Sequence, residues 1–224
     1  MTELAVQRAN MVESQVRPSD VTDRRIVRAM GALPRERFVA DEARAVAYMD
    51  QDVPAKGGAA RGRAARMMLA PRALAKLVQL ADLDAGERVL DVGCASGYST
   101  ALLAQLAGKV IGLEADAGVA EAARSLIAEL KLTNAQIETG ALSEGARRHA
   151  PFDAILLQGC IPEAPGGLLG QLKPGGRLVA ILADGTFGKA TIWRRSGESA
   201  DMRPMFDAGG PALPGFERKT AFVF

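Results

Sequence analysis

The most informative stretch for the fold of this chain is Val89-Leu90-Asp91-Val92-Gly93-Cys94-Ala95-Ser96-Gly97-Tyr98. An apolar run leads into a tight turn with two glycines and then into residues with helical spacing, which predicts a buried strand, a turn and a helix. The spacing Gly93-x-x-x-Gly97 lacks the middle glycine that admits a pyrophosphate in dinucleotide-binding loops. No Lys-Ser/Thr pair follows the turn, so it is not a P-loop. The turn therefore favours a nucleoside ligand without a diphosphate, which the glycines allow to approach the backbone.

The same alternation continues along the chain from residue 85. Short apolar runs that alternate with helical stretches imply right-handed βαβ units and a parallel sheet covered on both faces. We therefore expect an α/β fold with a Rossmann-like, doubly wound and mostly parallel sheet. Strands are expected at 88–92, 109–113, 135–138, 152–157 and 177–182, helices at 98–106, 118–130 and 162–172, and a turn at 173–176.

The chain divides near residue 85 into an N-terminal helical cap with a substrate-side loop, residues 1–84, and a cofactor-binding domain, residues 85–224, which together form one compact unit. In the cap we expect helices from Thr2 to about Gln15, from Thr22 to Met30, and after Pro71, which suits a first-turn position. The stretch 55–66 contains three glycines and four basic residues and predicts a mobile loop. At the other end, 191–195 and 220–224 are expected to add an antiparallel edge pair.

Composition excludes several classes of protein. Among 224 residues, 28 Lys and Arg face 26 Asp and Glu, so the net charge of +2 makes nucleic acid an unexpected partner. No apolar run approaches the roughly 18–20 residues that cross a bilayer. The first ten residues, MTELAVQRAN, place polar side chains where a secretion signal has an apolar core, so we expect a cytoplasmic protein. With one histidine, His149, and two cysteines, no metal site is expected.

Glu114 supplies the second half of the ligand argument. It ends the second expected strand, 21 residues after Gly93, where an acidic residue can accept hydrogen bonds from both ribose hydroxyls. A nucleoside with an intact ribose and no phosphates points to S-adenosylmethionine. The alternative is that Gly93 and Gly97 only tighten the turn and that Glu114 is a solvated strand end.

Several motifs carry a resemblance to a known family. VLDVGCASGY, VIGLE, APFDAI and LKPGGRLV resemble class I S-adenosylmethionine-dependent methyltransferases, and MVESQVRP, VTDRRIVRAMGALPRERFV and AYMDQDVP resemble the start of protein-L-isoaspartate O-methyltransferases. The resemblance covers most of residues 11–182. It implies methyl transfer to the isoaspartyl carboxylate of damaged peptides and proteins. The cofactor-binding residues that it implies are Asp91, Gly93, Ser96, Gly97, Glu114, Ala115, Gly140, Ala141 and Leu142.

Two positions depart from the family pattern. Its Thr-x-Ser-x-Pro motif is replaced by Met67-Met68-Leu69-Ala70-Pro71, with Leu69 at the Ser position, and its Gly-Asp pair after the third strand is Gly140-Ala141. No catalytic residue is therefore assigned. Two alternatives stay open: the same scaffold with a changed acceptor, a small acid or an RNA, or a catalytically silent S-adenosylmethionine-binding protein.

The substrate side is expected around Arg63, Arg66, Leu69 and Pro71. Residues 53–81 contain six basic and no acidic residues, and they lead into the expected cleft. We hypothesise that Arg63 or Arg66 attracts an anionic acceptor. The alternative is a solvated, flexible loop. The sequence does not indicate an oligomeric state.

The reaction suits the side chains available. A carboxylate with a pKa of about 4 is ionised at neutral pH and attacks a sulfonium methyl group without a general base. Asp91 is expected to bond backbone amides of the glycine turn, His149 to lie in a surface turn, and Trp193 to pack against the sheet edge.

Overall fold

The computed structural model describes residues 2–58, 65–183 and 187–217. A seven-stranded sheet has the strand order β5-β4-β3-β6-β7-β8-β9. Strands β3 to β7 run parallel, which confirms the expected α/β class. Their bounds are Arg88–Val92 (β3), Lys109–Glu114 (β4), Ala135–Thr139 (β5), Phe152–Ile161 (β6) and Leu172–Leu182 (β7).

Alternate residues along each strand divide the sheet into two apolar faces, because successive side chains of a strand point to opposite sides. On β3, Val89 joins one buried cluster and Leu90 the other. The first cluster also contains the N-terminal cap and the helices α3, α4 and α5. Their bounds are Pro71–Ala81 (α3), Tyr98–Ala104 (α4) and Ala117–Glu129 (α5).

The second face is covered by shorter elements. The helix expected at 162–172 is only the four-residue α6, Gly166–Leu169. Two prolines lack the N–H that a helix interior uses, and three glycines carry a large entropic cost in a helix, so the longer helix does not form. The remaining cover comes from Leu142, in the 3₁₀ turn Leu142–Glu144, from Ala146 and from Leu213 near the end of the described chain. A second 3₁₀ turn, Arg147–His149, contains no buried residue.

The turn expected at 173–176 is absorbed into β7. That strand starts at Leu172, and its pairing with β6 shifts register between Phe152 and Ala154. Gly175 has φ +77°, a conformation that glycine adopts readily. The change of direction that the sequence predicted is therefore an irregularity inside a strand.

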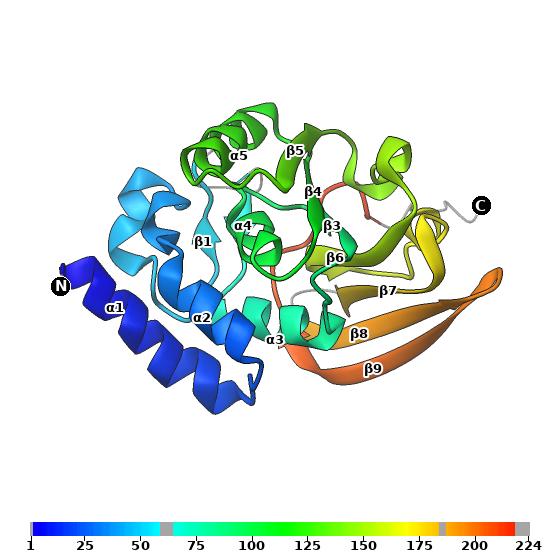
Figure 1. Ribbon diagram of the computed structural model, residues 1–224, viewed down its shortest axis with the longest axis horizontal. Coiled ribbons are helices and arrows are strands. Elements are labelled where there is room, and N and C mark those ends of the chain that lie inside the picture. Colours follow the sequence, from blue (N-terminus) through cyan, green and yellow to red (C-terminus); the bar gives the residue numbers. More distant parts are fainter. Residues whose placement is uncertain (1, 59–64, 184–186, 218–224) are drawn as a thin grey trace, which may run out of the picture.

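A long hairpin forms one edge of the sheet. β8, Phe187–Ser196, pairs antiparallel with β7 and with β9, Ser199–Gly209. The expected antiparallel strand at 191–195 is confirmed, but its pairing with 220–224 is wrong, because β7 and β9 occupy both sides of β8. Residues 220–224 themselves lie outside the described part of the chain. Figure 1 shows this hairpin projecting on the side of the molecule opposite α1.

The N-terminal cap packs against strands β6, β7 and β8 through α3, and α2 lies against α3 and α4. The first expected helix is confirmed as α1, Glu3–Met11, which continues into a π-helical turn, Val12–Val16, and a 3₁₀ turn, Arg17–Ser19. Asp23 caps α2 by accepting a hydrogen bond from Arg25 N at 2.8 Å. The other cap elements are α2, Arg24–Ala32, the 3₁₀ turns Arg35–Arg37 and Asp41–Val46, and the paired strands β1, Val53–Pro54, and β2, Met67–Met68.

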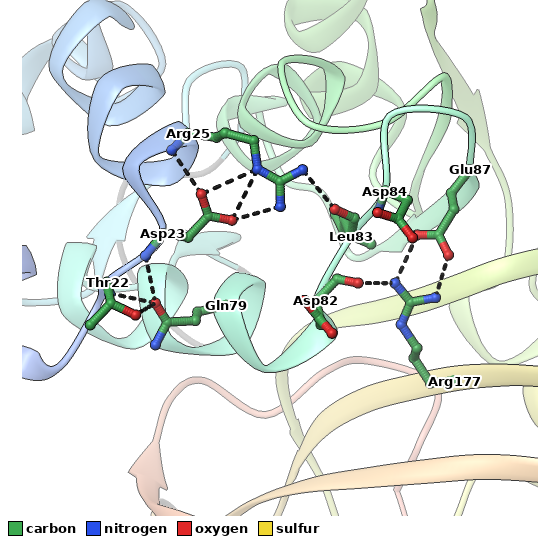
Figure 2. A network of polar contacts seen from close by, with 9 residues as sticks. All are labelled: Thr22, Asp23, Arg25, Gln79, Asp82, Leu83, Asp84, Glu87 and Arg177. Carbon is green, nitrogen blue, oxygen red and sulfur yellow. Dashed lines mark hydrogen bonds and ion pairs between the residues drawn. The ribbon is translucent and has the colours of Figure 1, made fainter.

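Polar contacts tie the cap to the amino ends of the central strands (Figure 2). Gln79 on α3 accepts a hydrogen bond from Thr22 N at 2.6 Å, just before α2. Arg177 on β7 donates from both terminal nitrogens to the Glu87 carboxylate, at 2.6 and 2.7 Å. It also donates to the Asp82 carbonyl at 2.6 Å. The Gln79 contact therefore joins two parts of the cap, and the Arg177 contacts fix the end of α3 against the sheet, at the edge opposite the glycine turn.

Candidate active site

The glycine turn lies at the carboxyl ends of the parallel strands, beside the point where the strand order reverses between β3 and β6. Open α/β sheets bind ligands at such a switch point. Gly93 N and Cys94 N both donate to the Leu113 carbonyl, at 2.8 and 3.1 Å, which ties the turn to β4. Gly93 and Gly97 have φ values of +73° and +91°, so both positions demand glycine.

The surroundings of the two glycines differ. A Cβ on Gly97 would lie 3.2 Å from Cβ of Ala123, so this glycine lets α5 approach the turn. A Cβ on Gly93 would lie 2.7 Å from Cδ2 of Leu213 and 3.2 Å from Nη2 of Arg66. Side chains of this chain therefore fill the space above Gly93.

Glu114, the residue expected to bind ribose, is completely buried. Arg66 Nε donates to its Oε1 at 2.8 Å and Arg66 Nη2 to its Oε2 at 3.1 Å. The same carboxylate accepts hydrogen bonds from three backbone amides that surround it, those of Ala95, Ala115 and Asp116. The alternative interpretation, a solvated strand end, is wrong, since this carboxylate is held by a cation and by backbone dipoles.

Arg66 is thus placed differently from the sequence-based expectation. We expected it on the acceptor side, with a solvated loop as the alternative, whereas its side chain is buried in the crevice against Glu114. The pattern of basic residues could not show this, because the partner carboxylate lies 48 positions further along the chain. Arg63 and the rest of 59–64 lie outside the described residues.

Asp91 has a different role from the one expected. It bonds side chains instead of turn amides: Oδ2 accepts from Ser99 Oγ and Thr100 Oγ1 at 2.7 and 2.6 Å, and Oδ1 accepts from Gln158 Nε2 at 2.6 Å. Burial raises the pKa of Asp91 to about 6, against the lowering effect of these three hydrogen bonds. Asp91 therefore joins β3, α4 and β6 beneath the turn and supports it from below.

Ser96 also turns away from the crevice. Its hydroxyl donates to the carbonyl of Phe38 in the cap and lies 3.2 Å from Sδ of Met68. Its side chain therefore joins the glycine turn to the cap. Sequence reasoning missed this link because Phe38 lies 58 residues earlier.

The residues expected around an adenine ring lie beyond β5. Gly140 N donates to the Glu114 carbonyl at 3.0 Å, so the strand end and the acidic residue are adjacent. Leu142 is buried, with Cδ1 3.5 Å from the Cβ position of Gly93. Ala141 is exposed and offers a methyl group where the family has a carboxylate.

Leu69, at the position of the family serine, is buried and lines a cavity of about 10 Å³ beside Gly93. Arg35 Nη2 donates to the Leu69 carbonyl at 2.8 Å, and the Arg35 guanidinium lies 4.9 Å from the Tyr98 ring centre. Pro71 begins α3 as expected. This cavity has the volume of a single water, far below the roughly 300–1,000 Å³ of a ligand pocket.

A much larger groove, of about 970 Å³, is lined by Ala70, the residue that follows Leu69. It runs between the cap, the start of α3 and the β8–β9 hairpin, and Ala70 and Gly210 lie on its wall. The described lining includes four Asp and two Lys side chains together with Arg72 and the highly exposed Phe187. The wall at 69–70 therefore separates this groove from the glycine turn.

Of the other reactive side chains, His149 lies away from the crevice, whereas Cys94 lies in the glycine turn. The His149 carbonyl accepts a hydrogen bond from Arg88, at the amino end of β3, so His149 is in a turn at the opposite end of the sheet. Burial raises the pKa of the Cys94 thiol well above its usual value. Among the described residues no cluster of three His, Cys, Asp or Glu side chains could hold a metal ion, and no helix has the length and apolarity to cross a bilayer.

The fold and the crevice define the class. Three features are those of a class I S-adenosylmethionine-dependent methyltransferase: the parallel core, the acidic residue that ends β4, and a glycine turn after β3 that lacks the middle glycine of dinucleotide-binding loops. The sequence model of the family described as protein-L-isoaspartate(D-aspartate) O-methyltransferase matches residues 6–203. The chain belongs to this family.

Relatives and solved structures agree with this membership. A protein-L-isoaspartate O-methyltransferase of Brucella anthropi is 37% identical over 205 residues, covering 91% of this chain and 89% of that protein. One from Koribacter versatilis is 36% identical over 179 residues, covering 80% of this chain and 78% of that protein.

Two solved structures share the fold. A protein-L-isoaspartate O-methyltransferase matches with a TM-score of 0.81 at 21% identity, covering 93% of this chain and 67% of its own. A Plasmodium falciparum protein assigned as a β-aspartate methyltransferase, in complex with S-adenosyl-L-homocysteine, matches with a TM-score of 0.76 at 21% identity, covering 93% and 98%.

The chemical groups at the crevice are suited to S-adenosylmethionine. Gly93 offers backbone without a side chain, and Glu114 offers a buried carboxylate suited to two hydroxyls. The space between them is taken by Arg66, Leu142 and Leu213 in this structure, so those side chains have to move before a nucleoside can enter.

Proposed function

We propose that this protein transfers a methyl group from S-adenosylmethionine to the isoaspartyl carboxylate of damaged peptides and proteins. The observation that carries the proposal is the buried carboxylate of Glu114 beside the positive-φ turn at Gly93, in a chain that matches the family model from residue 6 to 203. Neither cysteine forms a disulfide, which agrees with action in the reducing cytoplasm.

The cofactor would be held by Gly93, Glu114, Ala115 and Leu142, all of which surround the crevice. When bound, S-adenosylmethionine supplies a methyl group activated by a positively charged sulfur. The protein's own contribution is alignment and the exclusion of water, because an ionised carboxylate needs no general base. The position of His149, at the far end of the sheet, agrees with a reaction that uses no histidine.

The groove along α3 supports a peptide acceptor. It is large enough for an extended peptide, and its inner end reaches Ala70, next to Leu69. An acceptor carboxylate bound at this end of the groove would be separated from the glycine turn by residues 69 and 70. Arg72 and Lys189 on the groove already pair with Asp50 and Asp207. Lys76, whose Nζ lies 4.3 Å from the Phe206 ring centre, is therefore the cation that offers positive charge to such a carboxylate.

A second candidate is a protein that binds the cofactor and has lost catalysis. Two observations favour it: Leu69 presents no hydroxyl at the family serine position, and Arg66 occupies the carboxylate that ribose needs. A methyltransferase with a changed acceptor, a small acid or an RNA, would be recognised by a different methylated product.

One assay separates these functions. The purified chain is incubated with methyl-labelled S-adenosylmethionine and an isoaspartyl peptide, beside the same peptide with normal aspartate, and the product is treated with mild base. We expect label on the isoaspartyl peptide alone, released as methanol because a methyl ester hydrolyses. Base-stable label, or binding of the cofactor with no transfer, contradicts the proposal.

A further inference from the structure

The ion pair of Arg66 and Glu114 places a cation inside the nucleoside crevice. The guanidinium uses two nitrogens on the two carboxylate oxygens, at 2.8 and 3.1 Å. Its Nη2 also reaches the Gly93 carbonyl at 3.4 Å. Both side chains are almost fully buried, with 8% and 0% of their surface exposed. Arg66 therefore spans the acidic residue and the glycine turn.

The ribose of a cofactor needs the same carboxylate oxygens. Both Glu114 oxygens already accept backbone amides, and the remaining lone pairs receive the guanidinium. Two ribose hydroxyls cannot donate to these positions while Arg66 holds them. Cofactor and guanidinium are therefore alternative partners of one carboxylate.

The guanidinium can leave without unfolding the loop that carries it. The Arg66 carbonyl accepts a hydrogen bond from Ala55 N at 2.8 Å, and the next two residues, Met67 and Met68, pair with β1. The backbone of this residue is thus fixed by the β1–β2 pair. Rotation of the arginine side chain alone opens the carboxylate.

We propose that Arg66 sets the affinity of this protein for its cofactor by acting as an internal competitor for Glu114. In the unliganded protein Arg66 neutralises a buried carboxylate that would otherwise lack a counter-ion. Cofactor binding then requires that Arg66 be displaced, so the measured affinity is reduced by the fraction of molecules in which the pocket is closed. The inference rests on the proposed function only for the identity of the nucleoside cofactor and not for the acceptor.

The competition gives Arg66 two opposite effects, which a purely structural residue does not have. Removing the cation leaves Glu114 buried without its partner, which lowers the stability of the free protein. The same change removes the competitor and raises the affinity for the nucleoside. A residue that only supports the fold would lower stability and leave affinity unchanged or weaker.

The test is calorimetric titration of S-adenosylhomocysteine into the wild type, R66M and R72M. Methionine keeps an unbranched apolar side chain at position 66 without the charge. R72M is the matched control, because it removes a cation from the same basic stretch, where Arg72 pairs with Asp50 on the surface. We expect R66M to bind at least about fivefold more tightly than the wild type, and R72M to stay within about twofold of it.

Thermal unfolding supplies the second readout. R66M is expected to melt below the wild type without ligand, and to gain more than the wild type on addition of S-adenosylhomocysteine. R66Q serves in the same two measurements if R66M does not fold. Equal or weaker binding by the folded variants overturns the proposal, as does a lack of binding by every form. Tighter binding with no methylation of an isoaspartyl peptide upholds the competition and overturns the proposed acceptor.

Discussion

The hydroxyl of Ser96, in the glycine turn, donates to the backbone carbonyl of Phe38 in the N-terminal cap. This contact joins two segments that local sequence patterns treat as independent. The glycine turn is therefore shaped both by its own backbone and by the cap that lies over it.

Replacing Ser96 with Ala tests this connection. The Phe38 carbonyl keeps a second hydrogen bond, from Lys56 N at 2.9 Å, so the substitution costs only one bond, about 1 kcal/mol of unfolding free energy. Urea denaturation measures the loss. S14A is the control, because Ser14 bonds only within the N-terminal helical segment, to the Asn10 carbonyl, and we expect a smaller change there. Equal losses would show that Ser96 does not join the cap to the turn.

Glu87 and Arg177 predict a dependence of stability on pH. Burial raises the pKa of Glu87, but the hydrogen bonds and charge of Arg177 outweigh it, so the pKa lies below its usual value. The pair therefore contributes above the ordinary glutamate pKa and is lost as pH falls through the lower folded-state value. We expect E87Q to cost about 3 kcal/mol at pH 7, because Arg177 is left buried without its partner, and much less near pH 3.

The control for E87Q is E121Q, which breaks the exposed pair of Glu121 and Arg124. Its expected cost is below about 0.5 kcal/mol at either pH. Urea titrations of both variants and the wild type at the two pH values give the comparison. A cost of E87Q that does not change with pH contradicts the assigned pKa direction.

Asp91 predicts a trend of opposite sign. Its pKa is raised to about 6 in the folded protein, chiefly by burial, so its contribution is complete below the unfolded pKa and is lost as pH rises through 6. In D91N the Ser99 and Thr100 hydroxyls can turn to accept from the amide. Between pH 4.5 and 7.5 the wild type should lose about 2 kcal/mol relative to D91N. Parallel stability curves for the two proteins would exclude an ionising Asp91.

Leu69→Ser restores the family residue beside the small cavity. Removing a buried leucine side chain costs about 2–4 kcal/mol of stability, as it also does in L69A. The hydroxyl of L69S can donate to an acceptor carboxylate, which L69A cannot do. We expect kcat/KM for an isoaspartyl peptide to be about tenfold higher in L69S than in L69A, since a hydrogen bond to a charged group is worth about 1.5 kcal/mol or more. Equal rates in the two variants would remove Leu69 from the acceptor site.

Much of the fold follows from local pattern. Four of the five parallel strands begin at their expected residues, because a buried strand between two turns has few alternatives for its apolar run. The fifth, β7, begins at Leu172 instead of 177 because it includes the expected turn. The expected helix at 162–172 was wrong where prolines and glycines oppose helical propensity. The partner of 191–195 was wrong because edge pairing depends on which strands are free in the assembled sheet.

Local residue patterns were sufficient to predict the strand–turn–helix at Gly93 and the acidic end of β4, since positive φ angles and strand ends depend on short stretches of chain. The contacts that those groups make depend on how distant segments pack together. Arg66 reaches Glu114 across 48 residues and Ser96 reaches Phe38 across 58. The physical reason is that a buried charge or hydroxyl takes whichever partner the packing brings within hydrogen-bond distance, and separation along the chain does not limit that choice.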